Sequence, residues 1–248
     1  VGYDHPLAEL SLEVRRGDRI CVMGDNGTGK STLLKSIIGE IPSLGGYMML
    51  GHQIEIGYFD QNLADFHSGN TVLEELWNDY PDLDMFKIRS VLGAFLFTAD
   101  EVFKEVNVLS GGEKVRLSLA KLMLKKANFL ILDEPTAGLD PKGKKEILDK
   151  IKEIQQDRHI TVILVSHSME EVAEYADRVI ALNGSEIVMD LPVRELFRHT
   201  EELEDLGLAA PEVKYFMQDL KESGLDVDPD AITVEEAAGS ILKAFGIS

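Results

Sequence analysis

The stretch GDNGTGKS at residues 24–31 constrains the fold of this chain more than any other feature of the sequence. Its glycines let backbone N–H groups turn inward around an anion, and a following helix adds positive potential at its N-terminus. The apolar run RICVMG (19–24) precedes it and LLKSIIG (33–39) follows it. We therefore expect a buried strand, a phosphate-binding loop and a helix that stops at Gly39. The alternative, a glycine-rich turn with an accidental lysine, is disfavoured by these flanks.

The polar groups of this loop suit a nucleotide with a bound metal ion. Lys30 supplies a point charge for the outer phosphates, and the Ser31 hydroxyl is a ligand for Mg²⁺, with Thr32 supporting the same region. By itself, this loop predicts a nucleotide bound with Mg²⁺ and does not say which nucleotide. The expected binding positions in this stretch are Gly24, Asn26, Gly27, Gly29, Lys30, Ser31 and Thr32.

A second apolar run, FLILDE (129–134), ends on two carboxylates. By itself, this pattern is often a strand that meets a turn. Downstream of a phosphate-binding loop it predicts a strand whose Asp133 helps to hold Mg²⁺ and whose Glu134 polarises the attacking water.

Composition limits the class of protein. The 248 residues are enough for one large α/β domain with an appendage, and 44% of them are hydrophobic. The net charge of −19 disfavours binding to a nucleic acid, because such a chain repels a phosphate backbone. The single cysteine, Cys21, is expected in the core. No apolar run is long enough to span a bilayer and the N-terminus shows no signal-peptide pattern, so we expect a cytoplasmic protein able to dock at the inner face of a membrane.

The remaining patterns predict the order of elements. Strands are expected at residues 10–14, 47–50, 53–61, 128–133, 160–166, 178–182 and 185–189, and helices at 111–127, 142–157 and 168–176, with a helical insertion at about 72–104. From Pro192 onward the chain changes to acidic amphipathic helices, with Pro211 as a helix start, Gly224 as a stop and TVEE (233–236) as a capping box. We divide the chain into a domain at 1–191, with a helical subdomain at about 62–127, and an extension at 192–248.

The pentapeptide LSGGE (109–113) points to a family. Lying between the loop and LILDEP, it resembles the signature of ATP-binding cassette (ABC) ATPases. That resemblance implies that Ser110, Gly111 and Gly112 open a helix and bind the γ-phosphate held by the other subunit of a dimer. It also implies an α/β P-loop NTPase fold of ABC type, with an antiparallel β subdomain, an α-helical subdomain and a C-terminal helical extension.

Four further positions match this family. Gln61 in YFDQ resembles the glutamine that reaches Mg²⁺ and the attacking water, and Asp140 in AGLD resembles the residue that crosses the dimer interface. His167 in LVSHS resembles the histidine that contacts the γ-phosphate, although a histidine at a strand end is often ordinary. Tyr3 resembles the aromatic residue that stacks on adenine, but a tyrosine near a terminus often only packs.

The resemblance implies that two head-to-tail protomers close over two ATP molecules. The partner is then a second copy or another cassette ATPase, and a membrane transporter subunit is a further partner. Because each chain carries a charge of −19, we expect the dimer to be weak without ATP.

The two parts of the chain resemble different branches of the family. Residues 1–136, with IGYFDQNL and VNVLSGGEKVRLSLAKLMLKKANFLILDEPT, resemble ABC-F proteins, which act on ribosomes. Residues 137–248 continue with AGLD and resemble the ATPase subunits of energy-coupling factor transporters, including their C-terminal helical extension. We interpret the chain as an engineered chimera that crosses over within LDEPT, the alternative being a natural, divergent cassette.

Three functions therefore remain open at this stage. The first is a transporter ATPase that hydrolyses ATP, with weak turnover if the two parts pack imperfectly. The second is an ABC-F-like, ribosome-associated translation factor, which the charge and the single cassette oppose. The third is an ATP-binding scaffold without a physiological partner.

Overall fold

The computed structural model describes residues 10–60 and 67–247, which form two compact units. The first unit holds the chain up to residue 13 together with residues 19–46 and 165–248. The second unit holds residues 14–18 and 47–164. The phosphate-loop motif therefore belongs to the first unit, and the LSGGE and FLILDE motifs belong to the second.

Three strands of a six-stranded sheet form the centre of the first unit, in the order β1-β5-β6. β1 and β5 are parallel and almost fully buried, whereas β6 is antiparallel to β5 and alternates between exposed and half-buried residues, as expected for an edge strand. The elements of this unit that precede the C-terminal helices are β1 (Arg19–Met23), α1 (Lys30–Ile37), α6 (Met169–Tyr175), β5 (Arg178–Asn183) and β6 (Glu186–Pro192).

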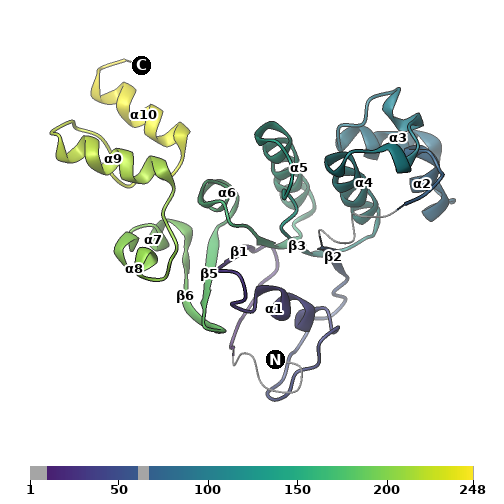
Figure 1. Ribbon diagram of the computed structural model, residues 1–248, viewed down its shortest axis with the longest axis horizontal. Helices are drawn as coiled ribbons and strands as arrows, with labels where there is room; N and C mark the ends of the chain where they lie inside the picture. Colours follow the sequence, from purple (N-terminus) through teal and green to yellow (C-terminus); the bar gives the residue numbers. More distant parts are fainter. Residues whose placement is uncertain (1–9, 61–66, 248) are drawn as a thin grey trace. The chain divides into compact units, whose positions relative to one another are not determined.

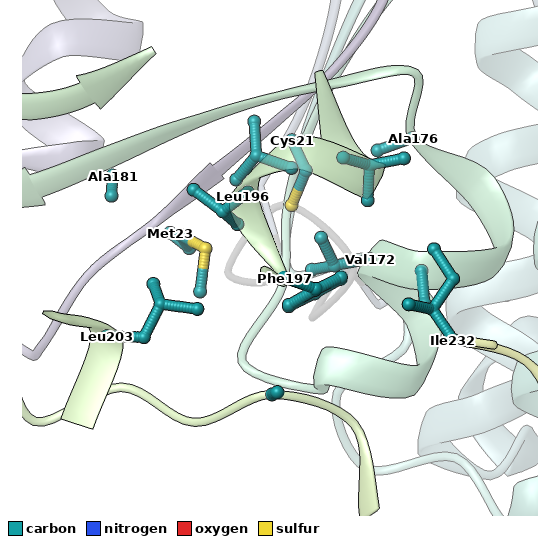
Figure 2. Close-up of a cluster of buried hydrophobic side chains, with 13 residues drawn as sticks. Cys21, Met23, Val172, Ala176, Ala181, Leu196, Phe197, Leu203 and Ile232 are labelled. Carbon is teal, nitrogen blue, oxygen red and sulfur yellow. The ribbon is translucent and has the colours of Figure 1, made fainter. Parts of the chain in front are cut away.

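Four helices follow β6 in the same unit: α7 (Val193–Leu196), α8 (Thr200–Asp205), α9 (Glu212–Glu222) and α10 (Val234–Ala244). Figure 2 shows side chains of α7 and α8 packed with side chains of β1 and α6 in one buried cluster. The cluster includes Met23, Val172, Phe197 and Leu203, each 0% exposed. The C-terminal helices thus share a core with the strand that leads into the phosphate loop.

Ion pairs join α9 and α10 to the rest of the C-terminal segment. Arg194 of α7 pairs with Glu236 of α10, and Asp230 accepts hydrogen bonds from Arg198 (3.1 Å) and Lys214 (2.7 Å). The predicted cap at Thr233 is confirmed, because its hydroxyl accepts the Glu236 N–H. The second bond of the predicted capping box, from the Thr233 N–H to the Glu236 carboxylate, is wrong. The Glu236 carboxylate accepts the Ile232 N–H instead, because it also reaches Arg194.

The second unit carries strands in the order β2-β3-β4 and a group of helices seen together in Figure 1. β2 and β3 are parallel, with Gly57 beside Leu130 and Asp60 beside Asp133. Its elements are β2 (Ile56–Asp60), α2 (Val72–Asp79), α3 (Met85–Ala94), the 3₁₀ helices η2 (Glu101–Phe103) and η3 (Val106–Val108), α4 (Gly111–Leu124), β3 (Phe129–Asp133), α5 (Pro141–Arg158) and β4 (Thr161–Val165).

A polar side chain caps the N-terminus of each α-helix in this unit, which explains where the helices begin. Thr71, Asp84, Ser110 and Asp140 each accept a backbone N–H from the first turn of their helix. The predicted helical insertion is therefore confirmed as α2 and α3, and the signature motif begins a helix as expected.

Two strand predictions are wrong. Residues 10–14 and 47–50 form no strand, and no strand pairs with them in the part of the chain that the structure describes, so the expected antiparallel β subdomain is not formed there. Tyr47 and Met49 are 88% and 83% exposed, unlike a strand that buries one face. A third strand begins later than predicted, at Ile56, because Gln53 adopts a left-handed conformation (φ 57°) that interrupts extended backbone.

No helix among residues 10–60 and 67–247 combines the length and the apolar character needed to cross a bilayer.

We expect Gly57→Ala to lower the free energy of unfolding by about 1–3 kcal/mol, because the new methyl group overpacks the helix–strand contact. A Cβ atom there would lie 2.9 Å from Leu122 Cδ1 and 3.0 Å from Ala127 Cβ. Gly93→Ala is the matched control, because its Cβ meets nothing within 4 Å in helix α3, and it should raise stability by about 0.5–1 kcal/mol. Urea titration measures both, and equal effects of the two changes would contradict the packing argument.

Candidate functional site

The predicted phosphate loop in the first unit adopts a conformation that suits its glycines. Gly24, Gly27 and Gly29 have φ values of 148°, 84° and 98°, a region that L-residues with side chains rarely enter. Buried strand β1 ends at Met23 and helix α1 begins at Lys30. The loop therefore lies between a strand end and a helix N-terminus, where free N–H groups and the helix dipole favour an anion.

The first glycine of this loop has no room for a side chain. A Cβ atom at Gly24 would lie 2.4 Å from the Leu182 carbonyl oxygen on β5 and 2.8 Å from Thr28 Oγ1. Cβ atoms at Gly27 and Gly29 would meet nothing closer than 3.8 Å. All three positions thus favour glycine by backbone conformation, and the first also excludes a side chain by close packing.

Lys30 lies inside the loop rather than in solvent. It is 7% exposed, and its Nζ donates to the carbonyl oxygens of Gly24 (2.7 Å) and Asp25 (2.9 Å). The Thr28 hydroxyl also donates to the Asp25 carbonyl (2.9 Å). Ser31 and Asn26 are exposed, whereas Thr32 is half-buried. The loop therefore presents a fixed cation and an accessible hydroxyl, which fit phosphate and Mg²⁺ oxygen chemistry.

His167 is exposed on the turn between β4 and α6, and buried polar groups flank it. Ser166 Oγ donates to Glu171 Oε2 at 2.6 Å, and both residues are buried. Ser168 caps α6 by accepting the Glu171 N–H (3.3 Å). The sequence prediction named the histidine and missed Ser166 and Glu171, although both flank it in SHSMEE.

In the second unit, Asp133 and Glu134 lie at the carboxyl end of β3, as predicted. Asp60, which was not predicted, is in register with Asp133 at the carboxyl end of parallel strand β2. Glu134 has a φ of 49°, which is uncommon for a residue with a side chain and often marks a functional position. Gln61 follows Asp60 directly but lies outside the described residues, as does Tyr3.

The LSGGE motif forms the N-terminus of α4. Ser110 Oγ accepts the Glu113 N–H (3.3 Å) and Glu113 Oε2 accepts the Ser110 N–H (2.8 Å), a reciprocal capping box. Gly111 is exposed and Gly112 half-buried in the first turn, where N–H groups lack a partner within the helix. The Ser110 hydroxyl thus has a structural role beside any role in binding.

The turn after β3 contacts this signature helix. A Cβ atom at Gly112 would lie 2.8 Å from Leu139 Cδ2, so the glycine allows Leu139 to pack against α4. Asp140 follows and caps α5, with Oδ1 accepting the Gly143 N–H at 2.8 Å. The structure therefore brings together two predicted pieces of the site, Ser110–Gly112 and Asp140, that lie far apart in the sequence.

A charged group supports the N-terminus of α4. Lys104 Nζ lies 2.9 Å from Glu113 Oε1. Burial raises the pKa of the Glu113 carboxyl, but the hydrogen bonds from Lys104 and from the Ser110 N–H outweigh burial and lower it below its usual value. The hydrogen bond to Glu113 likewise raises the pKa of the Lys104 ammonium. Glu113 is therefore ionised at neutral pH and lies where the helix dipole favours a negative charge.

Comparison with protein families identifies a match to the ABC transporter model over residues 7–137. Among curated proteins, the energy-coupling factor transporter ATP-binding protein EcfA2 of Acetivibrio thermocellus is 34% identical over 254 residues, which is 96% of this chain and 90% of that protein. The ATP-binding protein YdiF of Bacillus subtilis is 44% identical over 200 residues. That match covers 80% of this chain, but the chain spans only 30% of the length of YdiF.

Solved structures share the fold. The structure of cbiO1 from Clostridium perfringens, part of the transporter complex cbiONQ, matches with a TM-score of 0.64 and 26% identity, over 84% of this chain and 90% of that one. The ATP-binding cassette MJ0796, solved as a dimer bound to ADP and Pi, matches with a TM-score of 0.64 and 23% identity, over 75% of this chain and 90% of that one. The predicted α/β fold of cassette type is thereby confirmed.

We expect Gly24→Ala to weaken nucleotide binding at least about tenfold, because the Cβ displaces the loop from the Leu182 carbonyl oxygen and misplaces the groups that face the phosphates. Gly27→Ala is the control: its φ of 84° is also positive, so an alanine is also strained there, but its Cβ lies in open space. It should weaken binding less. Isothermal titration with ATP measures both, and a larger loss in Gly27→Ala would contradict the steric explanation.

Glu113→Gln should lower stability at pH 7 by about 0.5–1 kcal/mol, because the amide keeps the cap but loses the charge. The pKa of Glu113 is lowered in the folded protein, so its contribution is present above the unfolded pKa and is lost as the pH falls through the folded pKa. The variant and the wild type should therefore converge in acid. Denaturant titration from pH 3 to pH 7 measures this.

The control for this experiment is Glu235→Gln. It also removes a carboxylate from the first turn of a helix, α10, but Glu235 is not part of a reciprocal capping box. A difference between wild type and Glu113→Gln that did not change with pH would contradict the assignment.

Proposed function

Because the chain belongs to the ABC transporter ATPase family, we propose that it binds Mg-ATP and hydrolyses it in a head-to-tail dimer. The observation that carries this proposal is the phosphate loop, with Lys30 buried inside it and Gly24 pressed against β5. This arrangement holds the cation and the N–H groups in place before any nucleotide arrives, which keeps the cost of reorganisation low.

In this proposal the loop binds the phosphates through its backbone N–H groups and Lys30. The Ser31 hydroxyl, Gln61 and the Asp133 carboxylate would hold Mg²⁺, which would neutralise phosphate charge when bound. These are hard oxygen donors of the kind that Mg²⁺ prefers. Support comes from their positions, with Ser31 accessible on the first turn of α1 and Asp133 at the carboxyl end of β3.

Glu134 acts as the group that polarises the attacking water, with Gln61 orienting it. The left-handed backbone of Glu134 supports this role, because strain of this kind is retained where a side chain must be aimed. His167 contacts the γ-phosphate from the turn before α6, and Tyr3 stacks on adenine.

The N-terminus of α4 then serves the second copy of the chain. Ser110, Gly111 and Gly112 bind the γ-phosphate held by the other protomer, through first-turn N–H groups that have no partner within the helix. Asp140 lies at the interface, and the packing of Leu139 on Gly112 supports a common movement of the two segments. Sealing two nucleotides between protomers excludes water, and product release reopens the dimer.

The physiological role is that of a transporter ATPase. Its support is the alignment with EcfA2 over 90% of that protein, which includes the C-terminal segment. The partners in this proposal are a second copy or another cassette ATPase and a membrane transporter subunit, which places the chain at the inner face of a membrane. Residues 1–191 form the nucleotide-binding domain and residues 192–248 form the extension.

A composite origin remains part of the proposal. Residues 1–136 come from an ABC-F-like branch and residues 137–248 from a transporter branch, joined within LDEPT. The support is the change of sequence pattern from LILDEPT to AGLD. Identity to YdiF is 44% over 80% of this chain and identity to EcfA2 is 34% over 96% of it, so both matches extend across the proposed join.

Glu134→Gln tests the proposed hydrolysis. It should lower the rate of phosphate release about 10²-fold or more, because the amide cannot take a proton from water, while ATP still binds and holds the dimer. Release by the wild type should rise more than linearly with protein concentration. The control is Glu153→Gln, an exposed change on α5. Equal rates in Glu134→Gln and wild type, or no release by the wild type at any concentration, would refute the proposal.

A further inference from the structure

We propose that Glu171 is a positioning residue for His167, which it holds in place through Ser166. This inference rests on the proposed function, in which His167 contacts the γ-phosphate. It adds a buried carboxylate to the group of residues on which turnover depends.

The hydrogen bond at the centre of this proposal is short and shielded. Ser166 is 5% exposed and Glu171 is 8% exposed, and 2.6 Å separates Ser166 Oγ from Glu171 Oε2. A hydroxyl donating to a carboxylate at this distance is about twice as strong as a bond between neutral groups, and exclusion of water strengthens it further. Losing this charge-assisted bond in a buried site is costly, so the bond restrains the residue before His167.

The residue after His167 is restrained by the same group of side chains. The Ser168 N–H donates to Ser166 Oγ at 3.1 Å, and the Glu171 N–H donates to Ser168 Oγ at 3.3 Å. Hydrogen bonds thus join Ser166 to Ser168, Ser168 to Glu171 and Glu171 to Ser166, and His167 lies between the first two of these residues in the sequence. His167 is exposed, whereas Ser166 and Glu171 are buried, so the buried hydrogen bond fixes the backbone of the turn that carries the histidine.

This polar group is anchored to the strand that leads into the phosphate loop. The Ser166 backbone hydrogen-bonds to the thiol of Cys21 on β1, three residues before Gly24. Val172, which follows Glu171, packs with Cys21 and Met23 in the buried cluster of Figure 2. Burial raises the pKa of the Cys21 thiol to about 12, so it remains a neutral partner. The turn that carries His167 and the strand that carries the loop are thus fixed to each other within the first unit.

A purely structural role is the alternative, and it predicts a different result. If Glu171 only stabilises the fold, its loss lowers the melting temperature but leaves the turnover of each folded molecule unchanged. If it positions His167, turnover falls in the folded protein, because a displacement of about 1 Å is enough to cost up to 10²-fold in rate.

The test compares Glu171→Leu, Glu171→Gln and Ser166→Ala. Glu171→Leu and Ser166→Ala should each lower kcat about tenfold or more and leave KM for ATP within about threefold, since they move the histidine and not the phosphate loop. Glu171→Gln should retain most of kcat, because its amide oxygen still accepts the Ser166 hydroxyl. Tyr215→Phe is the control, since it removes the hydrogen bonds with Ala210 and Glu204 in the same unit and leaves the bond between Ser166 and Glu171 in place.

A double-mutant cycle separates action through His167 from any other effect. In the His167→Ala background, Glu171→Leu should cause no further loss of kcat. Independent losses that multiply in the double variant would overturn the proposal, as would a kcat of Glu171→Leu equal to that of the wild type at matched folded concentration. If Glu171→Leu fails to fold, Ser166→Ala carries the same test.

A second readout does not depend on hydrolysis. The imidazole signals of His167, assigned by their loss in His167→Ala, are followed by NMR as the pH is raised. Glu171→Leu should shift these signals and Tyr215→Phe should not, and unchanged signals would overturn the positioning role. If the signals shift while His167→Ala retains full turnover, the positioning role holds and the proposed role of His167 fails.

Discussion

The close approach of Gly24 to the Leu182 carbonyl oxygen is the constraint on which the phosphate loop depends. A Cβ atom added at Gly24 would lie 2.4 Å from that oxygen, so the chain that leaves β1 passes too close to β5 for any residue other than glycine. The carbonyl groups of Gly24 and Asp25 then face Lys30, which donates to both. The steric limit at one residue thus fixes the direction of the backbone and the position of the cation.

Capping explains why the same residues serve structure and binding. Ser110, Asp140 and Ser168 each accept a backbone N–H at the start of a helix. A helix N-terminus needs such an acceptor, and its remaining free N–H groups attract an anion. At Ser110, a residue type that favours helix initiation therefore coincides with a proposed binding position. A loss of activity on changing this residue has to be separated from a loss of the cap.

The sequence was sufficient for what depends on local pattern. The loop between β1 and α1, the strand ending at Asp133 and the helix beginning at Gly111 were all predicted, because glycine spacing, apolar runs and capping residues act over a few positions. Residues 47–50 were assigned as a strand for their apolar character, but a strand also needs a pairing partner, which composition does not reveal.

Contacts between distant residues could not be predicted for the same reason. Nothing in the sequence indicates that Leu139 packs against Gly112, or that the Ser166 backbone hydrogen-bonds to the thiol of Cys21. The bond between Ser166 and Glu171 spans five residues, a separation that neither helix nor strand periodicity highlights. These contacts become visible only once strands and turns are placed.

The C-terminal segment differs in composition from the rest of the chain but packs against the strand that leads into the phosphate loop. Its acidic, amphipathic character differs from the rest of the chain, yet Phe197 and Leu203 pack with Met23, the last residue before the loop. Gly207, which ends α8 in a left-handed conformation, would place a Cβ atom 3.3 Å from the Asp25 carboxylate. A packed interior does not deform at one point alone, because neighbouring side chains must move together. A shift of the loop therefore acts on α7 and α8, and a shift of those helices acts on the loop, which gives the first unit a physical route between nucleotide and C-terminal segment.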